Sequence, residues 1–165
     1  MAIVLREVTR AAADAILAGE QPGELRVADD YPTEFSAGVA QVVGAERQFG
    51  PFFLHRAEDE LVVGEIGGAF VDEEGTIEIG YAVVKSQWNR GYATEAVEAI
   101  VTRARATPEV RRIVAHAPLE RPKSGRVLEK AGFGPVREPE DEDAEGNVVR
   151  VKEWELETPI PTAAE

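Results

Sequence analysis

The feature that most constrains the fold is a helical repeat of apolar residues directly after strand-like sequence. The residues of its apolar face are spaced i, i+3, i+4, i+7, i+8 and i+11, namely Ala93, Ala96, Val97, Ile100, Val101 and Ala104. This spacing is typical of an amphipathic α-helix with one buried face. The pair Thr107-Pro108 ends the repeat, since proline has no N–H with which to continue a helix.

Three runs rich in Phe, Val and Ile precede this helix and predict strands. They are residues 51–55, 61–71 and 76–84. Polar connections at residues 57–60 and 72–75 separate them, which favours an antiparallel meander. The glycines of residues 64–68 lie within the second run, so we interpret them as a β-bulge and not as a phosphate-binding loop.

The N-terminal part predicts one strand and two helices. Residues 2–8 predict a short strand, and Thr9 suits the N-cap of an alanine-rich helix that ends at Gly19. Thr33 suits the cap of a second helix that Gly44 would end. The apolar face of that helix would carry Phe35, Val39, Val42 and Val43.

The C-terminal part predicts a buried strand at residues 112–117 and a helix with Pro122 in its first turn and Gly132 as its C-cap. Two last strands, residues 133–137 and 148–156, flank an acidic connection. Six carboxylates crowd it: Glu138, Glu140, Asp141, Glu142, Asp143 and Glu145. Because like charges repel, we expect this connection to be extended and mobile.

These elements predict a fold of class α+β, or mixed α/β, with a central mixed sheet of six to seven strands flanked by about four helices. A chain of 165 residues is long enough for one domain with its own core. We expect residues 1–157 to form that domain and residues 158–165 to be a flexible tail.

The composition narrows the range of partners. The net charge is −13, which opposes nonspecific binding to nucleic acid or anionic membranes and favours cationic partners, although many proteins are acidic for solubility alone. Cysteine is absent, which suits a cytoplasmic protein. The N-terminus predicts no signal peptide, and no apolar run is long enough to span a membrane.

A turn rich in polar residues, residues 85–94, joins the third strand of the meander to the long helix. The first turn of a helix has N–H groups without intrahelical partners at the positive end of the helix dipole, so such a junction favours an anion. Gly91 has no Cβ and lets a phosphate approach the backbone, while Arg90 adds a cation. The alternative is a glycine-containing turn with no ligand.

Three segments carry a resemblance to a known family. WNRGYATEA at residues 88–96, preceded by IEIGYAVVKSQ and followed by KSGRVLEKAGF, resembles the GNAT superfamily of acyl-CoA-dependent N-acyltransferases. The similarity covers residues 64–136 and is strongest to the branch containing the ribosomal-protein N-terminal acetyltransferases. The order of the predicted elements fits the GNAT fold over the whole chain.

The resemblance implies acetyl-CoA as co-substrate. It implies that backbone amides of the turn hold the pyrophosphate, at Asn89, Arg90, Gly91, Tyr92, Ala93 and Thr94. It also implies that the preceding strand splays from its neighbour and binds pantetheine through Tyr81, Ala82, Val83 and Val84.

Two positions depart from the family pattern. Residues 120–122 read Glu-Arg-Pro where the family often has an asparagine that contacts pantetheine, and Leu128 stands where many members have a tyrosine that protonates the leaving thiolate. Ser124 matches a serine of the branch and would contact the cofactor sulfur. Alternatively, its hydroxyl only satisfies the first turn of a helix.

For the base, the resemblance implies Glu78, because the family often places a glutamate on this strand. Strand alternation puts Glu78 opposite the apolar Ile77 and Ile79, and a solvent-facing glutamate without a role is the alternative. Glu65 and His116 are lesser candidates. A backbone N–H near Val83 would stabilise the oxyanion. The two histidines have no partners at ligand spacing, so no metal site is expected.

The sequence thus predicts an N-acetyltransferase that moves an acetyl group from acetyl-CoA to a primary amine in a ternary complex. The acceptor would be a small molecule or a peptide, expected to be cationic, and a homodimer is possible. Two alternatives stay open: a non-catalytic coenzyme A-binding sensor or interaction module, and a nucleotide-binding regulator that uses the same anion turn.

Overall fold

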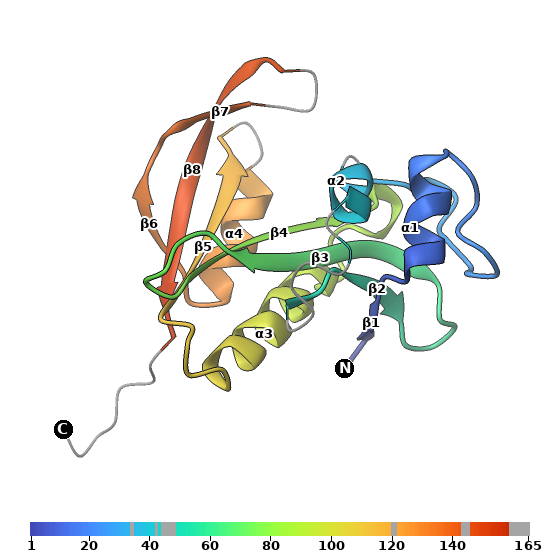
Figure 1. Ribbon diagram of the computed structural model, residues 1–165, viewed down its shortest axis with the longest axis horizontal. Helices are drawn as coiled ribbons and strands as arrows, with labels where there is room; N and C mark the ends of the chain where they lie inside the picture. Colours follow the sequence, from blue (N-terminus) through green and yellow to red (C-terminus); the bar gives the residue numbers. More distant parts are fainter. Residues whose placement is uncertain (34, 42, 44–48, 120–121, 143–145, 159–165) are drawn as a thin grey trace.

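The computed structural model describes residues 1–33, 35–41, 43, 49–119, 122–142 and 146–158 of the chain (Figure 1). The elements follow in the order β1 (Ile3–Glu7), α1 (Arg10–Leu17), α2 (Ser36–Gln41), β2 (Phe52–Arg56), β3 (Val62–Phe70), β4 (Thr76–Val83), a 3₁₀ helix (Lys85–Gln87), α3 (Tyr92–Arg105), β5 (Arg112–Pro118), α4 (Pro122–Lys130), β6 (Gly134–Arg137), β7 (Glu140–Glu142) and β8 (Val148–Glu157). This order confirms the predicted α+β class.

One mixed sheet organises the chain. Its strand order is β1-β2-β3-β4-β5-β8-β6, and β7 pairs with β8 beside this path. Only the β4–β5 pair is parallel among the described strands, since α3 crosses over between them, and the other pairs are antiparallel. Strands β2, β3 and β4 form the predicted antiparallel meander.

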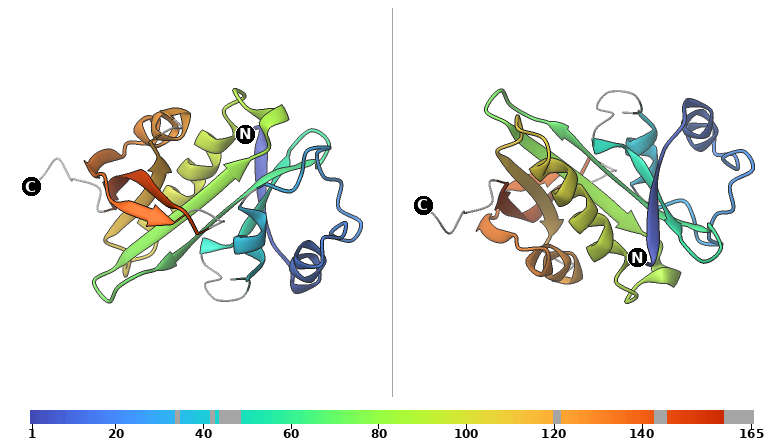
Figure 2. Two further views of the ribbon diagram at one scale, coloured as in Figure 1. Left: turned by 90° about the horizontal axis from the view of Figure 1, so that it is seen from above. Right: turned by 90° about the horizontal axis from the view of Figure 1, so that it is seen from below.

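Helices cover both faces of the sheet (Figures 1 and 2). On one face, Val97 and Ile100 of α3 lie in the main core with Leu54 and Ile66. On the other face, a second core joins α1 and α2 to β2 and β3 through Ala12, Ala13, Val39, Phe53 and Val62. The split follows strand alternation, because neighbouring residues such as Phe53 and Leu54 point to opposite faces.

Several helix ends lie where the sequence predicts them. The side chain of Thr9 accepts a hydrogen bond from the N–H of Ala12 and caps α1, and Gly19 follows that helix with φ +73°. Thr33 Oγ1 accepts from the N–H of Phe35 just before α2. Gly132 follows α4 with φ +98°. The predicted end of the second helix, at Val42 and Gly44, falls outside the described residues.

The acidic connection differs from the prediction. Residues 140–142 form β7, which pairs with residues 148–150 of β8, so this part is a hairpin strand and not an extended loop. Pairing satisfies the backbone of β7, and Glu140 lies opposite Arg150, which offsets part of the repulsion. Asp143 and Glu145 lie outside the described residues. The extra strand explains why the sheet has eight strands and not six to seven.

The chain is tied to the sheet just after β8, and residues 159–165 of the predicted tail lie outside the described residues. Thr158, predicted as the first residue of a flexible tail, is buried. Its hydroxyl donates to the carbonyl of Val110 at 2.6 Å, and its N–H donates to the carbonyl of Arg111 at 3.1 Å. The last strand is therefore tied down through residue 158, because its polar groups find buried partners.

Candidate active site

The polar turn before α3 has the backbone of an anion site. Asn89 and Gly91 both have left-handed backbone angles, with φ +64° and +81°. Gly91 is the N-cap of α3, and among the described residues no side-chain hydrogen bond caps the start of this helix. A Cβ built on Gly91 would meet nothing within 4 Å, so the space above it is open. Such a turn directs several N–H groups toward one point, which suits a phosphate.

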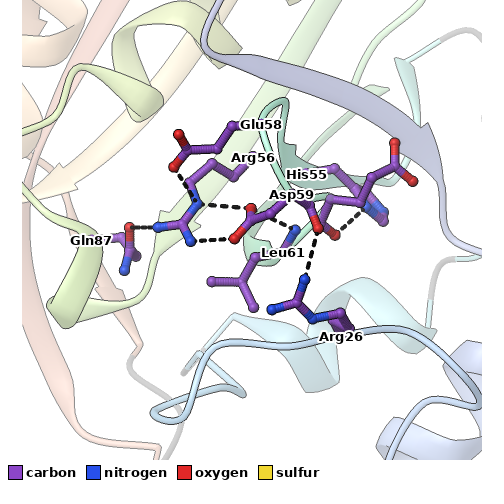
Figure 3. Close-up of polar contacts among 8 residues, drawn as sticks. Arg26, His55, Arg56, Glu58, Asp59, Leu61 and Gln87 are labelled. Atoms are coloured by element: carbon purple, nitrogen blue, oxygen red, sulfur yellow. Dashed lines mark hydrogen bonds and ion pairs between the residues drawn. The ribbon is translucent and has the colours of Figure 1, made fainter.

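The turn is anchored to the rest of the protein on the side of the 3₁₀ helix. Asp30 accepts hydrogen bonds from the N–H and the hydroxyl of Ser86, at 2.8 and 2.6 Å. Arg56 donates to Gln87 Oε1 at 3.2 Å, as Figure 3 shows. The indole N–H of Trp88 donates to the carbonyl of Val83 at 2.7 Å. Sequence reasoning missed the anchors from Asp30 and Arg56, because they join segments far apart in the chain.

Arg56 is itself held in place (Figure 3). Its guanidinium makes two hydrogen bonds to the carboxylate of Asp59, and this pairing lowers the pKa of Asp59 to about 2. Only 19% of the Arg56 side chain is exposed. The β2–β3 turn thus braces the start of the polar turn through one bidentate ion pair.

The edge of β4 next to this turn is open. β4 pairs with β5 only from Thr76 to Ile79, so residues 80–83 have β3 on one side and none of the described strands on the other. The N–H of Val84 donates to Val63, and by the alternation of an antiparallel ladder Ala82 also bonds to β3. Tyr81 and Val83 therefore turn their backbone groups toward the gap. The carbonyl of Val83 accepts from Trp88, while its N–H faces the gap.

Ser124 lies across this gap, in the first turn of α4. The hydroxyl of Tyr81 donates to its backbone carbonyl at 3.1 Å. The side-chain hydroxyl of Ser124 makes no hydrogen bond to the part of the chain that the structure describes. Leu128, one turn further, is fully buried in the core. It occupies the position where many family members have a tyrosine. Residues 120 and 121 lie outside the described chain.

Glu78 lies on the face of the sheet opposite α3, in contact with His116. Glu78 Oε1 is 3.0 Å from His116 Nδ1, and His116 Nε2 is 3.0 Å from Glu153 Oε1. Arg137 in turn donates to Glu153 Oε2 at 2.9 Å. The structure thus brings together the first candidate base and one of the lesser candidates, together with Glu153 and Arg137, which sequence reasoning missed.

The ionisable side chains of this group shift one another's pKa values. Partial burial by itself would lower the pKa of His116, but the hydrogen bonds to Glu153 and Glu78 outweigh it and raise that pKa. The hydrogen bond from Arg137, assisted by that from His116, lowers the pKa of Glu153. The group therefore favours an imidazolium between two carboxylates.

The remaining candidate, Glu65, is fully buried on β3. Its carboxylate accepts hydrogen bonds from the hydroxyls of Thr33, at 2.8 Å, and Ser36. Glu65 therefore holds the start of α2 against the sheet, and its carboxylate is not accessible to an acetyl acceptor.

The profile of the acetyltransferase (GNAT) domain family matches residues 3–134 of this sequence. The chain belongs to the GNAT acetyltransferases. Among curated relatives, this GNAT chain is 26% identical over 141 residues to the uncharacterized N-acetyltransferase YoaA of Bacillus subtilis, which covers 79% of this chain and 78% of YoaA. It is 40% identical over 88 residues to the uncharacterized N-acetyltransferase YjdG of the same organism, over 52% and 51% of the two chains.

Solved structures share the GNAT fold. A GNAT-family acetyltransferase from Bacillus anthracis is 17% identical, with a TM-score of 0.68 over 96% of each chain. A chimera of the spermidine N-acetyltransferase SpeG from Vibrio cholerae with hSSAT is 15% identical, with a TM-score of 0.69 over 96% of each chain. The yncA protein of Salmonella typhimurium, solved with its cofactor acetyl-CoA, is 15% identical, with a TM-score of 0.67 over 98% of this chain and 96% of yncA.

Two negative findings complete the description of this GNAT chain. Within the described ranges, no group of three or more His, Asp or Glu side chains is placed to hold a metal ion. In the Glu78–His116–Glu153 group the carboxylates lie at opposite nitrogens of one ring, so their oxygens do not converge. Among the described helices, none is both long and apolar enough to cross a membrane.

Proposed function

We propose that this GNAT acetyltransferase transfers an acetyl group from acetyl-CoA to a primary amine by direct attack in a ternary complex. The observation that carries the proposal is the junction of two features: an uncapped helix start with two left-handed residues, and an open strand edge that leads away from it. The first suits a pyrophosphate, and the second suits an amide-containing arm such as pantetheine. The acetyl-CoA complex of the fold neighbour yncA supports this assignment.

Backbone groups would do most of the cofactor binding. The N–H groups of residues 89–94 would hold the pyrophosphate, with Arg90 as a nearby cation. Tyr81 would pair with pantetheine through its backbone groups, while Ala82 and Val84 keep the strand on β3. Val83 would contact the acetyl end of the cofactor, because its carbonyl already accepts from Trp88. The N–H of Val83, which faces the gap, would donate to the oxyanion.

In the reaction, the acceptor nitrogen attacks the thioester carbonyl, the C–N bond forms and the C–S bond breaks. An ammonium cannot attack, and an amine with a pKa of about 8 to 10 is mostly protonated at neutral pH. We assign Glu78 to take the proton from the nitrogen, because its side chain is 44% exposed on the face opposite α3. Ser124 would give its hydroxyl proton to the leaving thiolate and recover one from solvent.

Ser124 is testable, because its hydroxyl has no hydrogen-bond partner among the described residues. We expect Ser124→Ala to lower kcat by roughly 10-fold to 100-fold and to leave the Kd of acetyl-CoA nearly unchanged. Steady-state kinetics and calorimetric titration with acetyl-CoA measure the two quantities. Ser124→Thr is the matched control, since it keeps the hydroxyl and should retain most of kcat. Wild-type kcat in the alanine variant would assign the proton to water or to the acceptor.

The acceptor is proposed to be cationic. The acidic strand β7 begins three residues after Arg137, which contacts the Glu78–His116–Glu153 group through Glu153. A negative rim near the site would attract an ammonium and speed its encounter with the enzyme. Spermidine N-acetyltransferases are among the fold neighbours, which makes polyamines one class to test. N-terminal peptides are the other class, in keeping with the ribosomal-protein branch that the sequence resembles.

Neutralising the acidic strand β7 tests whether its carboxylates attract the cationic acceptor or are only solvated surface charges. We expect the triple variant Glu140→Gln, Asp141→Asn, Glu142→Gln to lower kcat/KM for the best cationic amine severalfold at low salt, and less at physiological salt, where charges are screened beyond about 8 Å. A control with the same charge change at remote exposed sites, Glu73→Gln, Glu98→Gln and Glu109→Gln, should keep kcat/KM. Equal losses of kcat/KM in the two triple variants would show that β7 acts only through the net charge of the protein.

The alternative is a coenzyme A-binding module without turnover, favoured by the buried leucine at position 128. A panel of polyamines, amino acids, aminoglycosides and N-terminal peptides, assayed for thiol release from acetyl-CoA, distinguishes the two functions. Amine-dependent release supports the transferase. Tight binding of acetyl-CoA without release by any amine supports the module.

A further inference from the structure

Behind Glu78, polar side chains from four adjacent strands form one continuous chain of hydrogen bonds. It runs from Glu78 on β4 through His116 on β5 and Glu153 on β8 to Arg137 on β6. These strands lie side by side in the sheet (Figure 1). Exposure falls along the first three side chains, from 44% to 22% to 11%. The chain thus leads from an accessible carboxylate into the sheet.

A glutamate alone has too low a pKa to be an effective base for the proposed reaction. Its ordinary pKa is about 4.3, whereas an acceptor ammonium has a pKa of about 8 to 10. Proton transfer is most effective when the pKa of the base lies near the operating pH. An imidazole, with an ordinary pKa of about 6.5, is closer, and His116 is the titratable ring in contact with Glu78.

We propose that Glu78 and His116 act together as the base, with Glu153 as the positioning residue that holds His116; this rests on the proposed function. In the active form His116 is neutral, its Nε2–H donates to Glu153, and the lone pair of Nδ1 faces Glu78. The proton of the attacking nitrogen passes to Glu78 and on to Nδ1. The product is an imidazolium between two carboxylates, which returns its proton to solvent through Glu78 before the next cycle.

The charges around His116 support this role. Glu78 from β4 and Glu153 from β8 are the charged side chains in contact with it among the described residues, and Arg137 from β6 keeps Glu153 ionised. Partial burial opposes a charge on His116, but the two hydrogen bonds outweigh it and raise its pKa above the ordinary value. Because the neutral ring is the active form, kcat should rise with pH through this raised pKa.

The test compares the pKa of His116 with the pH dependence of kcat. The chain has only two histidines, so NMR titration of the ring signals is simple, and the spectrum of His116→Gln assigns the remaining signal to His55. We expect Glu153→Gln to lower the pKa of His116 and to move the acidic limb of the kcat–pH profile to lower pH by the same amount. His116→Gln should abolish that limb and lower kcat roughly 100-fold. The amine is the best acceptor of the panel above.

The control is Glu155→Gln, which removes the same charge two residues along β8, where Glu155 pairs with Val114. This variant should change neither the pKa of His116 nor the acidic limb of the kcat–pH profile. A limb that stays in place while the NMR pKa moves would overturn the relay, as would wild-type kcat in His116→Gln. A purely structural role of Glu153 would lower kcat without moving the limb. No thiol release by the unmodified protein with any amine would instead overturn the proposed function, before any variant is compared.

Discussion

Replacing Gly91 with valine is expected to abolish measurable binding of acetyl-CoA at concentrations that saturate the wild-type protein. Gly91 has φ +81°, where a β-branched residue costs about 1–2 kcal/mol or more, and relief of that strain would flatten the turn that gathers the N–H groups. The new side chain would also fill the open space above the turn. The measurement is the rise in Tm with acetyl-CoA, which reports binding to the folded state by mass action.

Backbone strain alone must be separated from loss of the site. Gly23 offers a matched control, since it has φ +64° and a Cβ there would also meet nothing within 4 Å. Gly23→Val should lower the Tm of the free protein by a similar amount and keep the full acetyl-CoA shift. If Gly91→Val keeps the shift as well, the cofactor does not lie on this turn.

Replacing Glu78 with glutamine is expected to lower kcat roughly 10²-fold to 10⁴-fold at neutral pH, the usual range for a general base. The Kd of acetyl-CoA should stay the same, because Glu78 lies on the face of the sheet opposite the helices that would flank the cofactor. The loss should shrink for an amine whose pKa lies below 7, since such an amine is already neutral when it binds. Equal losses for neutral and charged amines would contradict the role of Glu78 as base.

The parts of the site that sequence reasoning predicts are those encoded locally. The repeat from Ala93 to Ala104 predicts α3, and the polar turn before it predicts the uncapped helix start at Gly91. Both depend on neighbours within a few residues, through helical periodicity and backbone freedom. The resemblance adds what local patterns cannot, namely the open edge of β4 and the expectation that acetyl-CoA is the co-substrate.

The parts that depend on strand order were not predictable in the same way. Glu78 and His116 are 38 residues apart, and they meet because β4 and β5 pair in parallel with Glu78 opposite Val114. Glu153 joins them only because β8 inserts between β5 and β6. Each of these contacts is set by the packing of the whole sheet, so the sequence predicts Glu78 and His116 as separate candidates and not as a pair.

The acidic connection shows the limit of an argument from charge alone. Repulsion among neighbouring carboxylates suggested an extended loop, yet residues 140–142 form β7. Each exposed pair of like charges costs little in water, of order tenths of a kcal/mol to 1 kcal/mol, while the strand satisfies its backbone against β8. Repulsion of this size does not prevent a short hairpin strand.

Transfer of an isotopically labelled acetyl group from acetyl-CoA to an amine tests the central claim most directly. The wild-type protein would be incubated with labelled acetyl-CoA and the best amine of the panel, followed by mass spectrometry of the products and titration of free thiol. We predict that the label appears in the amide product, with one thiol released for each label transferred and no release without the amine. Release of thiol with the label recovered as free acetate, or bound acetyl-CoA that stays intact with every amine, would contradict the assignment as an N-acetyltransferase.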